Sequence, residues 1–184
     1  MEQDASKLVL ETDRLFLRPL HLDDLDALAA IQADPEVMRY FTSGPRNRVE
    51  VRNELERCIQ LQSDHGFSLW AAIDRTDGHL IGRCGLLPQK LQDHDEVEIA
   101  YLIDRSRWGL GLGTEAARAI RDFGFDQLGL GRLVSIIHRD NLASRRVAEK
   151  AGLRPERSIQ FMNHRCWLYA VRFQDRPNSI GERR

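Results

Sequence analysis

The stretch "RWGLGLGTEAARAI", Arg107–Ile120, places three glycines at alternate positions and then becomes a helix-like run. Glycines let the backbone turn at little steric cost, and a helix that starts directly after them points its free N–H groups at whatever lies above. Phosphate is a natural ligand for that arrangement. A glycine cluster alone is also compatible with a flexible connection, so the flanking elements have to decide.

Two common nucleotide-binding motifs do not fit the stretch. A P-loop requires Gly-Lys-Ser/Thr, whereas Gly113 is followed by Thr114 and Glu115. A Rossmann fingerprint requires GxGxxG, but Gly113 comes one position early and Thr114 occupies the place of the last glycine. The loop therefore belongs to neither class.

A strand precedes the loop and a helix follows it. Residues Glu96–Asp104 alternate in a strand-like way, and Thr114–Gln127 has helical spacing that ends before Gly129 and Gly131. The apolar positions that carry these patterns are Val97, Ile99, Tyr101 and Ile103 in the strand and Ala116, Ile120 and Phe123 in the helix. The loop is thus predicted at the carboxyl end of a strand.

The rest of the chain alternates strands and helices in the same manner. We expect strands at Arg14–Leu20, Phe67–Ile73, His79–Leu87, Arg132–His138, Leu153–Phe161 and Cys166–Phe173. We expect helices from about Asp23 to Asp34, at Val49–Gln62, and from Asp140 or Asn141 to Gly152. The inward face of the second helix is predicted to carry Val51, Leu55, Cys58 and Ile59. Asp77-Gly78 predicts a tight hairpin turn. The pattern predicts an α/β fold with a mixed central sheet of about seven strands flanked by about four helices.

Composition narrows the functional classes. The 184 residues suit one domain, 1–184, with a core at about 13–173 and flexible ends. The 27 basic and 28 acidic residues leave a net charge of -1, which argues against nucleic-acid and membrane partners. Three widely spaced cysteines indicate no metal site. With neither a signal peptide nor an eighteen-residue apolar run, we expect a cytoplasmic protein.

Several stretches, in order, resemble the GNAT acyl-CoA N-acetyltransferase superfamily, and in particular its RimJ/RimL-like branch of protein N-terminal acetyltransferases. They are "TDRLFLRPL", "DPEVMRYF", "VEIAYLIDRSRWGLGLGTEAARAI", "DNLASRRVAEKAGL" and "WLYAVR", which together span almost the whole chain. The superfamily loop motif is Gln/Arg-x-x-Gly-x-Gly/Ala. Here Trp108 takes the first position, as is common in that branch, and Gly111 and Gly113 match the glycines.

The resemblance implies the GNAT fold and acetyl-CoA as the acyl donor, with no metal. The loop would bind the pyrophosphate, and the backbone of the preceding strand would bond the pantetheine and polarise the thioester carbonyl. The donor-binding residues so implied are Tyr101, Leu102, Ile103, Trp108, Gly109, Leu110, Gly111, Leu112, Gly113, Thr114, Asn141 and Ser144. Asn141 is also a helix cap candidate, and the two roles are compatible.

Glu98 is the candidate base. An α-amino group titrates near pH ~8 and needs only a mild base, whereas a lysine amine titrates near ~10.4 and needs a stronger one. Glu98 lies on the strand before the loop, facing away from Tyr101, at a position where related sequences often carry the base. The alternative is a structural carboxylate that is satisfied by backbone groups or by Arg107.

Ser144 is the candidate acid. Many superfamily members place a tyrosine seven residues after the asparagine, but this chain has Ala148 there. Ser144 matches a serine of the RimL-like branch and would protonate or hydrogen-bond the departing thiolate, although a serine in a first helical turn is also ordinary capping chemistry. Tyr169 is a fallback acid.

The resemblance implies that the acceptor enters between the first two helices and the last hairpin. Arg46, Arg48, His164 and Arg165 give those segments positive character, which suits an acidic protein N-terminus. The first hypothesis is therefore direct acetyl transfer to a protein N-terminal α-amine by a monomer or homodimer. A small-molecule amine is the enzymatic alternative. A non-catalytic acyl-CoA-binding module is the other, favoured by the missing tyrosine at Ala148.

Overall fold

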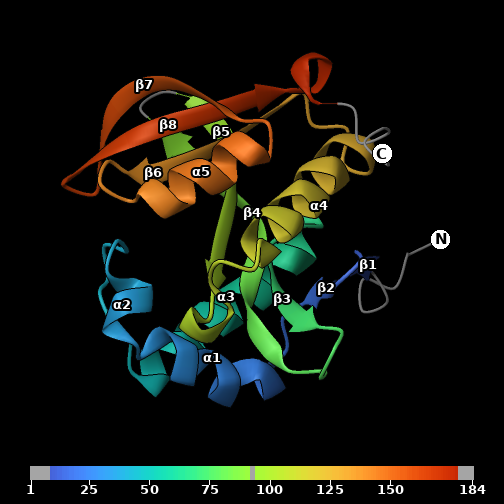
Figure 1. The fold of residues 1–184 in the computed structure, drawn as a ribbon, viewed down its shortest axis with the longest axis vertical. Coiled ribbons are helices and arrows are strands. Elements are labelled where there is room, and N and C mark those ends of the chain that lie inside the picture. Colours follow the sequence, from blue (N-terminus) through green and yellow to red (C-terminus); the bar gives the residue numbers. More distant parts are fainter. Residues whose placement is uncertain (1–8, 92–93, 178–184) are drawn as a thin grey trace.

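The computed structural model describes residues 9–91 and 94–177. Eight strands within these ranges form one sheet in the order β1-β2-β3-β4-β5-β6-β8-β7 (Figure 1). β5 and β6 run parallel, and the other neighbours are antiparallel. The strands are β1 (Leu10–Glu11), β2 (Leu15–Pro19), β3 (Leu69–Asp74), β4 (Leu80–Leu91), β5 (His94–Ile103), β6 (Arg132–His138), β7 (Arg154–Phe161) and β8 (His164–Arg172).

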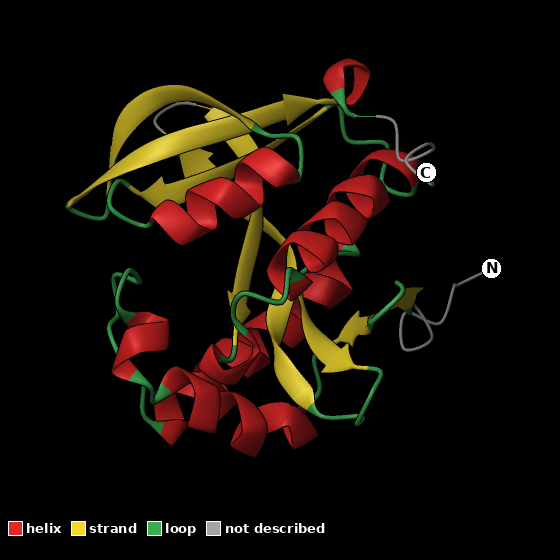
Figure 2. Cartoon of the chain, in the orientation of Figure 1, coloured by secondary structure: helices red, strands yellow, loops and turns green. Residues whose placement is uncertain are grey.

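Helices cover both faces of this sheet (Figure 2). Trp70 of β3 points to one face, where its ring lies 5.0 Å from that of Phe123, and the next residue, Ala71, packs on the opposite face. The first face carries α4 (Leu112–Asp126) and the second carries α1 (Leu25–Gln32) and α3 (Arg48–His65). The shorter elements are α2 (Pro35–Met38), α5 (Leu142–Lys150), η2 (Leu22–Asp24), η3 (Arg105–Arg107) and η4 (Phe173–Asp175).

The mixed α/β sheet predicted from the sequence is confirmed, with differences in its short elements. β1 is an eighth strand of two residues that pairs with Phe16 and Leu17 of β2. α2 is a four-residue helix that begins at Pro35, directly after the predicted helix end at Asp34, and Asp34 is its cap. α4 begins at Leu112, two residues before the predicted start, because Gly111 takes the capping position.

The inward face of α3 differs from the prediction at one residue. Val51, Leu55 and Cys58 are buried as expected, but Ile59 is exposed. A residue that follows a buried position lies about 100° further around a helix, so Cys58 and Ile59 do not share a narrow face. Glu54 is buried instead, because Arg46 and Arg83 both pair with its carboxylate.

The parallel strands β5 and β6 part soon after they meet. They pair where Glu98 lies opposite Val134. Next to that point, side chains bond the backbone of the neighbouring strand: the Ser135 hydroxyl donates to the Ile99 carbonyl at 2.7 Å, and the Ile136 N–H donates to Glu98 Oε1 at 3.2 Å. β5 stays paired with β4 as far as Ile103. Towards its carboxyl end, β5 thus keeps one edge without a strand partner.

Candidate active site

The glycine loop joins the end of β5 to the start of α4. Gly109 and Gly111 have φ angles of 78° and 81°, which residues with a Cβ rarely adopt. The N–H groups of Thr114 and Glu115 bond back to the Gly111 carbonyl at 3.1 Å. Those of Leu112 and Gly113 come before this first helical hydrogen bond, so they are available to a ligand above the helix.

The loop is held from below by two side chains. The Arg14 guanidinium donates to the Leu110 carbonyl at 2.8 Å and pairs with Glu115, in the first turn of α4, at 2.6 Å. The Trp108 indole N–H donates to the Ile103 carbonyl at 2.8 Å, although half of the Trp108 surface is exposed. Trp108 therefore lies partly on the surface rather than packing fully beneath the loop, and it ties the loop to the end of β5.

The first turn of α5 meets β5 through Ser144. Asn141 is the helix cap, and its Oδ1 accepts from the Ser144 N–H at 3.0 Å. The Tyr101 hydroxyl lies 2.8 Å from the Ser144 carbonyl oxygen and 2.9 Å from Ser144 Oγ. Sequence reasoning assigned Tyr101 only a backbone role. Strand alternation placed its side chain on the face opposite Glu98, but no local signal indicated which helix the hydroxyl would reach.

Glu98 is buried at the parting of β5 and β6, with 9% of its surface exposed. Oε2 accepts from Gln89 Nε2 at 2.7 Å, and Oε1 accepts from the Ile136 N–H. Burial raises the pKa of Glu98 to about 7, despite these hydrogen bonds. Arg107 pairs instead with Asp74 and Asp77, so the predicted alternative of an Arg107 partner for Glu98 is wrong.

Glu98 and Tyr101 lie on opposite faces of β5. Successive strand residues alternate between faces, and Ala100 packs with the α1 and α3 cluster while Tyr101 packs with the α4 cluster. Glu98 therefore shares a face with Ala100, and Ser144 reaches Tyr101 from the other side. The candidate base and the candidate acid approach the parted strands from different sides of the sheet.

The fallback acid, Tyr169, is fully buried, and its hydroxyl bonds other residues than Ser144. Its hydroxyl donates to Glu149 Oε1 at 3.0 Å and accepts from Arg145 Nε at 2.9 Å. Ala148 is also buried. Leu102 and Ile103 point their side chains into the core, so their backbone groups are what they offer to a ligand.

The two segments expected to border the acceptor do approach each other. Thr42, after α2, donates to the Met162 sulfur at 3.4 Å, and the Tyr40 and His138 rings lie 5.3 Å apart. The positive character expected there is reduced. Arg46 pairs with Glu54 at 2.7 Å and Arg48 pairs with Asp26 at 2.8 Å, because carboxylates from α3 and α1 lie within reach.

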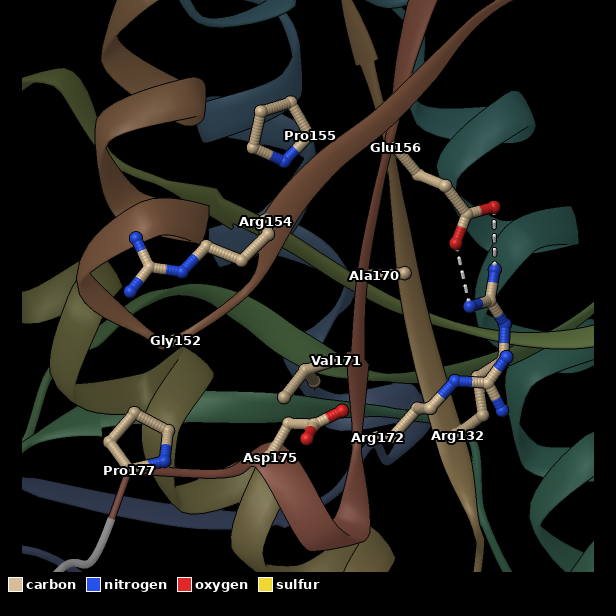
Figure 3. Close-up of a pocket in the computed structure, with 10 residues that line it drawn as sticks. All are labelled: Arg132, Gly152, Arg154, Pro155, Glu156, Ala170, Val171, Arg172, Asp175 and Pro177. Atoms are coloured by element: carbon tan, nitrogen blue, oxygen red, sulfur yellow. Dashed lines mark hydrogen bonds and ion pairs between the residues drawn. The ribbon is translucent and has the colours of Figure 1, made fainter.

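A hollow of about 320 Å³ lies over β7 and β8, apart from the glycine loop (Figure 3). It is lined by Arg132, Gly152, Arg154, Pro155, Glu156, Ala170, Val171, Arg172, Asp175 and Pro177. Arg132 is held there by Glu156 at 2.8 Å. None of the site residues predicted from the sequence lines this hollow, so we place the candidate site at the parted strands.

Two searches of the described residues bear on other site classes. Among residues 9–91 and 94–177, no group of three His, Cys, Asp or Glu side chains is arranged to hold a metal ion. In the same ranges, no helix combines the length and apolarity needed to cross a membrane.

Comparison with known proteins gives a consistent result. The profile of the acetyltransferase (GNAT) domain matches residues 14–154. The uncharacterized protein YkkB of Bacillus subtilis (strain 168) is 34% identical over 165 residues, covering 89% of this chain and 95% of YkkB. Spermidine N(1)-acetyltransferase of Escherichia coli (strain K12) is 29% identical over 141 residues, covering 76% of this chain and 73% of that protein.

A solved structure has the same fold. RimL, a ribosomal-protein alpha-N-acetyltransferase in complex with coenzyme A, superposes with a TM-score of 0.76 over 90% of this chain and 98% of RimL, at 18% identity. At that identity the likeness concerns the fold alone.

We predict that Glu98→Gln stabilises the protein in a pH-dependent way. Because the pKa of Glu98 is about 7 in the folded protein, against 4.5 normally, the stabilising protonated form is fully present below about pH 4.5 and lost as pH rises through 7. The variant, which cannot ionise, should gain on the order of 3 kcal/mol over the wild type above pH 7 and little near pH 4.5. Urea unfolding across this range measures the difference.

Glu56→Gln is the control, because Glu56 is exposed and its carboxylate pairs with Arg52 on the surface. Its effect should stay within about 0.5 kcal/mol at every pH. A Glu98→Gln effect that does not change with pH would mean that Glu98 is not protonated by burial.

Proposed function

The chain belongs to the acetyltransferase (GNAT) family, and on that premise we propose that it transfers an acetyl group from acetyl-CoA directly to a primary amine, with a protein N-terminal α-amine as the acceptor. One observation carries the proposal. β5 parts from β6 directly below a glycine loop that opens α4, so an unpaired strand edge and a helix N-terminus face the same space.

The donor would bind along that edge. The amides of Trp108 to Thr114 would hold the pyrophosphate, since helix N-termini favour anions. The pantetheine would bond the backbone of Tyr101, Leu102 and Ile103 as a further strand would, with Asn141 and Ser144 beside it. The positive φ angles at Gly109 and Gly111 fit this role, because they bring the backbone to the ligand without a side chain between.

Glu98 would accept the proton of the attacking amine. A base with a pKa of about 7 is matched to an α-amine that titrates near pH ~8. The amine nitrogen bonds the thioester carbonyl carbon, the carbon–sulfur bond breaks, and its electron pair moves to sulfur. Ser144 would donate to that sulfur as the charge forms. Both groups support turnover over a binding-only module, despite Ala148.

The acceptor is proposed from chemistry and from relatives. The ion pairs of Arg46 and Arg48 remove much of the argument for an acidic acceptor. The pKa of Glu98 favours an α-amine, which is the acceptor of the RimJ/RimL-like branch. The spermidine acetyltransferase among the relatives favours a small-molecule amine, which is the second candidate. The three buried, free cysteines are in keeping with the reducing cytoplasm.

The acceptor class can be tested in one competition assay. The protein is mixed with isotope-labelled acetyl-CoA and a pool of N-terminal peptides, polyamines, amino acids and aminoglycosides, and the label is located by mass spectrometry. We expect label on peptide α-amines. Label on a small amine alone would replace the acceptor assignment and keep the enzyme class. If none of the acceptors becomes labelled, the enzyme assignment is contradicted.

We predict that Gly113→Leu weakens coenzyme A binding at least tenfold. A Cβ at Gly113 would make only ordinary contacts, 3.7 Å to Ile103 and 3.8 Å to Val147, so the chain can still fold. The longer side chain would then extend between the end of β5 and α5, where the donor is placed. Calorimetric titration with coenzyme A measures the change.

Gly131→Leu is the matched control. A Cβ there meets nothing within 4 Å, and Gly131 directly precedes the first residue of β6, whereas α5 follows the last one. Its affinity should equal that of the wild type. Unchanged binding in Gly113→Leu would remove the loop from the donor site.

We predict a distinct pH profile for Glu98→Gln. In the wild type both Glu98 and the α-amine must lose a proton, so log kcat/KM should rise with a slope of two below pH 7 and a slope of one between pH 7 and about 8. The variant should lose about 100-fold in kcat/KM at pH 8, and its profile should keep a slope of one up to about pH 8. A wild-type rate with the Gln variant would leave Glu98 a purely structural carboxylate.

A further inference from the structure

The side chain of Tyr101 takes part in a contact that the donor site does not require. Its hydroxyl crosses from β5 to the first turn of α5, where it donates to the Ser144 carbonyl oxygen at 2.8 Å and lies 2.9 Å from Ser144 Oγ. Asn141 accepts from the N–H of the same serine. Ser144 is therefore held at all three of its polar groups.

The number of protons limits how these groups can pair. Tyr101 and Ser144 each carry one hydroxyl proton. If the phenol donates to the Ser144 carbonyl, its oxygen accepts the serine proton, and the serine has no proton to offer elsewhere. If the phenol donates to Oγ, the serine proton is released. The two arrangements differ only by rotation about the hydroxyl bonds.

Position 148 and Tyr169 do not offer a hydroxyl in place of Tyr101. Position 148 is alanine, and the Tyr169 hydroxyl is engaged by Glu149 and Arg145. Burial raises the pKa of the Tyr101 phenol, which keeps it protonated and makes it a lasting donor rather than a source of protons.

We propose that Tyr101 is a positioning residue: as charge forms on the sulfur of the donor, the phenol proton turns from the Ser144 carbonyl to Ser144 Oγ, and the serine proton turns towards that sulfur. The inference rests on the proposed function. During transfer the carbon–sulfur electron pair goes to sulfur, and the serine hydroxyl stabilises that charge as a hydrogen-bond donor while keeping its proton. The amine proton goes to Glu98 and then to water, and the thiolate takes a proton from water.

The test compares coenzyme A with desulfo-coenzyme A, in which hydrogen replaces the thiol. Affinities are measured by calorimetry at pH 9, where a larger share of the thiol is ionised. A hydrogen bond to a charged group strengthens binding by roughly tenfold or more. Wild-type protein should therefore prefer coenzyme A by about that factor. In Ser144→Ala the preference should disappear, and in Tyr101→Phe it should fall because the serine proton is no longer turned towards the sulfur. Desulfo-coenzyme A should bind as before in both variants.

Tyr169→Phe is the matched comparison, since it also removes one buried phenol hydroxyl from the same fold. It should retain the wild-type preference for the thiol. In acetyl transfer, Tyr101→Phe should lower kcat about tenfold and change the KM for acetyl-CoA less than twofold. Because Tyr101 acts through Ser144, the double variant should be no slower than Ser144→Ala.

Three results would overturn the inference: a retained thiol preference in Tyr101→Phe, a preference lost in Tyr169→Phe instead, or additive losses in the double variant. If Tyr101→Phe does not fold, a thiol preference that is retained in Ser144→Ala is sufficient to overturn the inference. A wild-type protein that binds neither compound overturns the proposed function itself, whereas binding of both without a thiol preference overturns this inference alone.

Discussion

The architecture depends on how β5 and β6 satisfy their backbone groups where they part. A buried N–H or C=O without a partner destabilises a fold, so two strands cannot simply separate inside a core. Here the Ser135 hydroxyl donates to the Ile99 carbonyl, and the Glu98 carboxylate accepts from the Ile136 N–H. These two side-chain hydrogen bonds replace backbone hydrogen bonds, so the pairing of β5 with β6 can end early. The edge of β5 beyond them is open to a ligand, and the loop and α5 are placed around that edge.

Glu98 links stability to chemistry through this same contact. The burial that lets its carboxylate replace a strand partner also raises its pKa to about 7. An ionised carboxylate at that depth costs stability near neutral pH, and functional sites often carry such a cost. The paired charges of Arg14 and Glu115 show a different use of charge, since they hold the loop to the first turn of α4. The site thus combines a destabilised group in the core with a stabilised loop above it.

Most of the fold could be predicted because long elements carry regular patterns. The spacing of Ala116, Ile120 and Phe123 indicated α4, and the apolar run Arg132–His138 matched β6 at both ends. The two-residue β1 and the four-residue α2 were missed, since so few residues show no period. Ile59 was placed inside although it is exposed, because the inward face of α3 is decided by what packs on it. Arg107 was a reasonable partner for Glu98 in sequence, but the hairpin turn brings Asp74 and Asp77 closer.

The sequence by itself determined the order of the longer strands and helices, the glycine loop at the end of β5 and the cap of α5, because each depends on residues within a few positions of one another. Only the tertiary structure decided that Glu98 is bonded by Gln89 and Ile136, that Tyr101 reaches Ser144, and that Tyr169 does not. These contacts join residues 9 to 43 positions apart. Their formation depends on how strands pair and on which helix packs over them, and a local sequence pattern predicts neither.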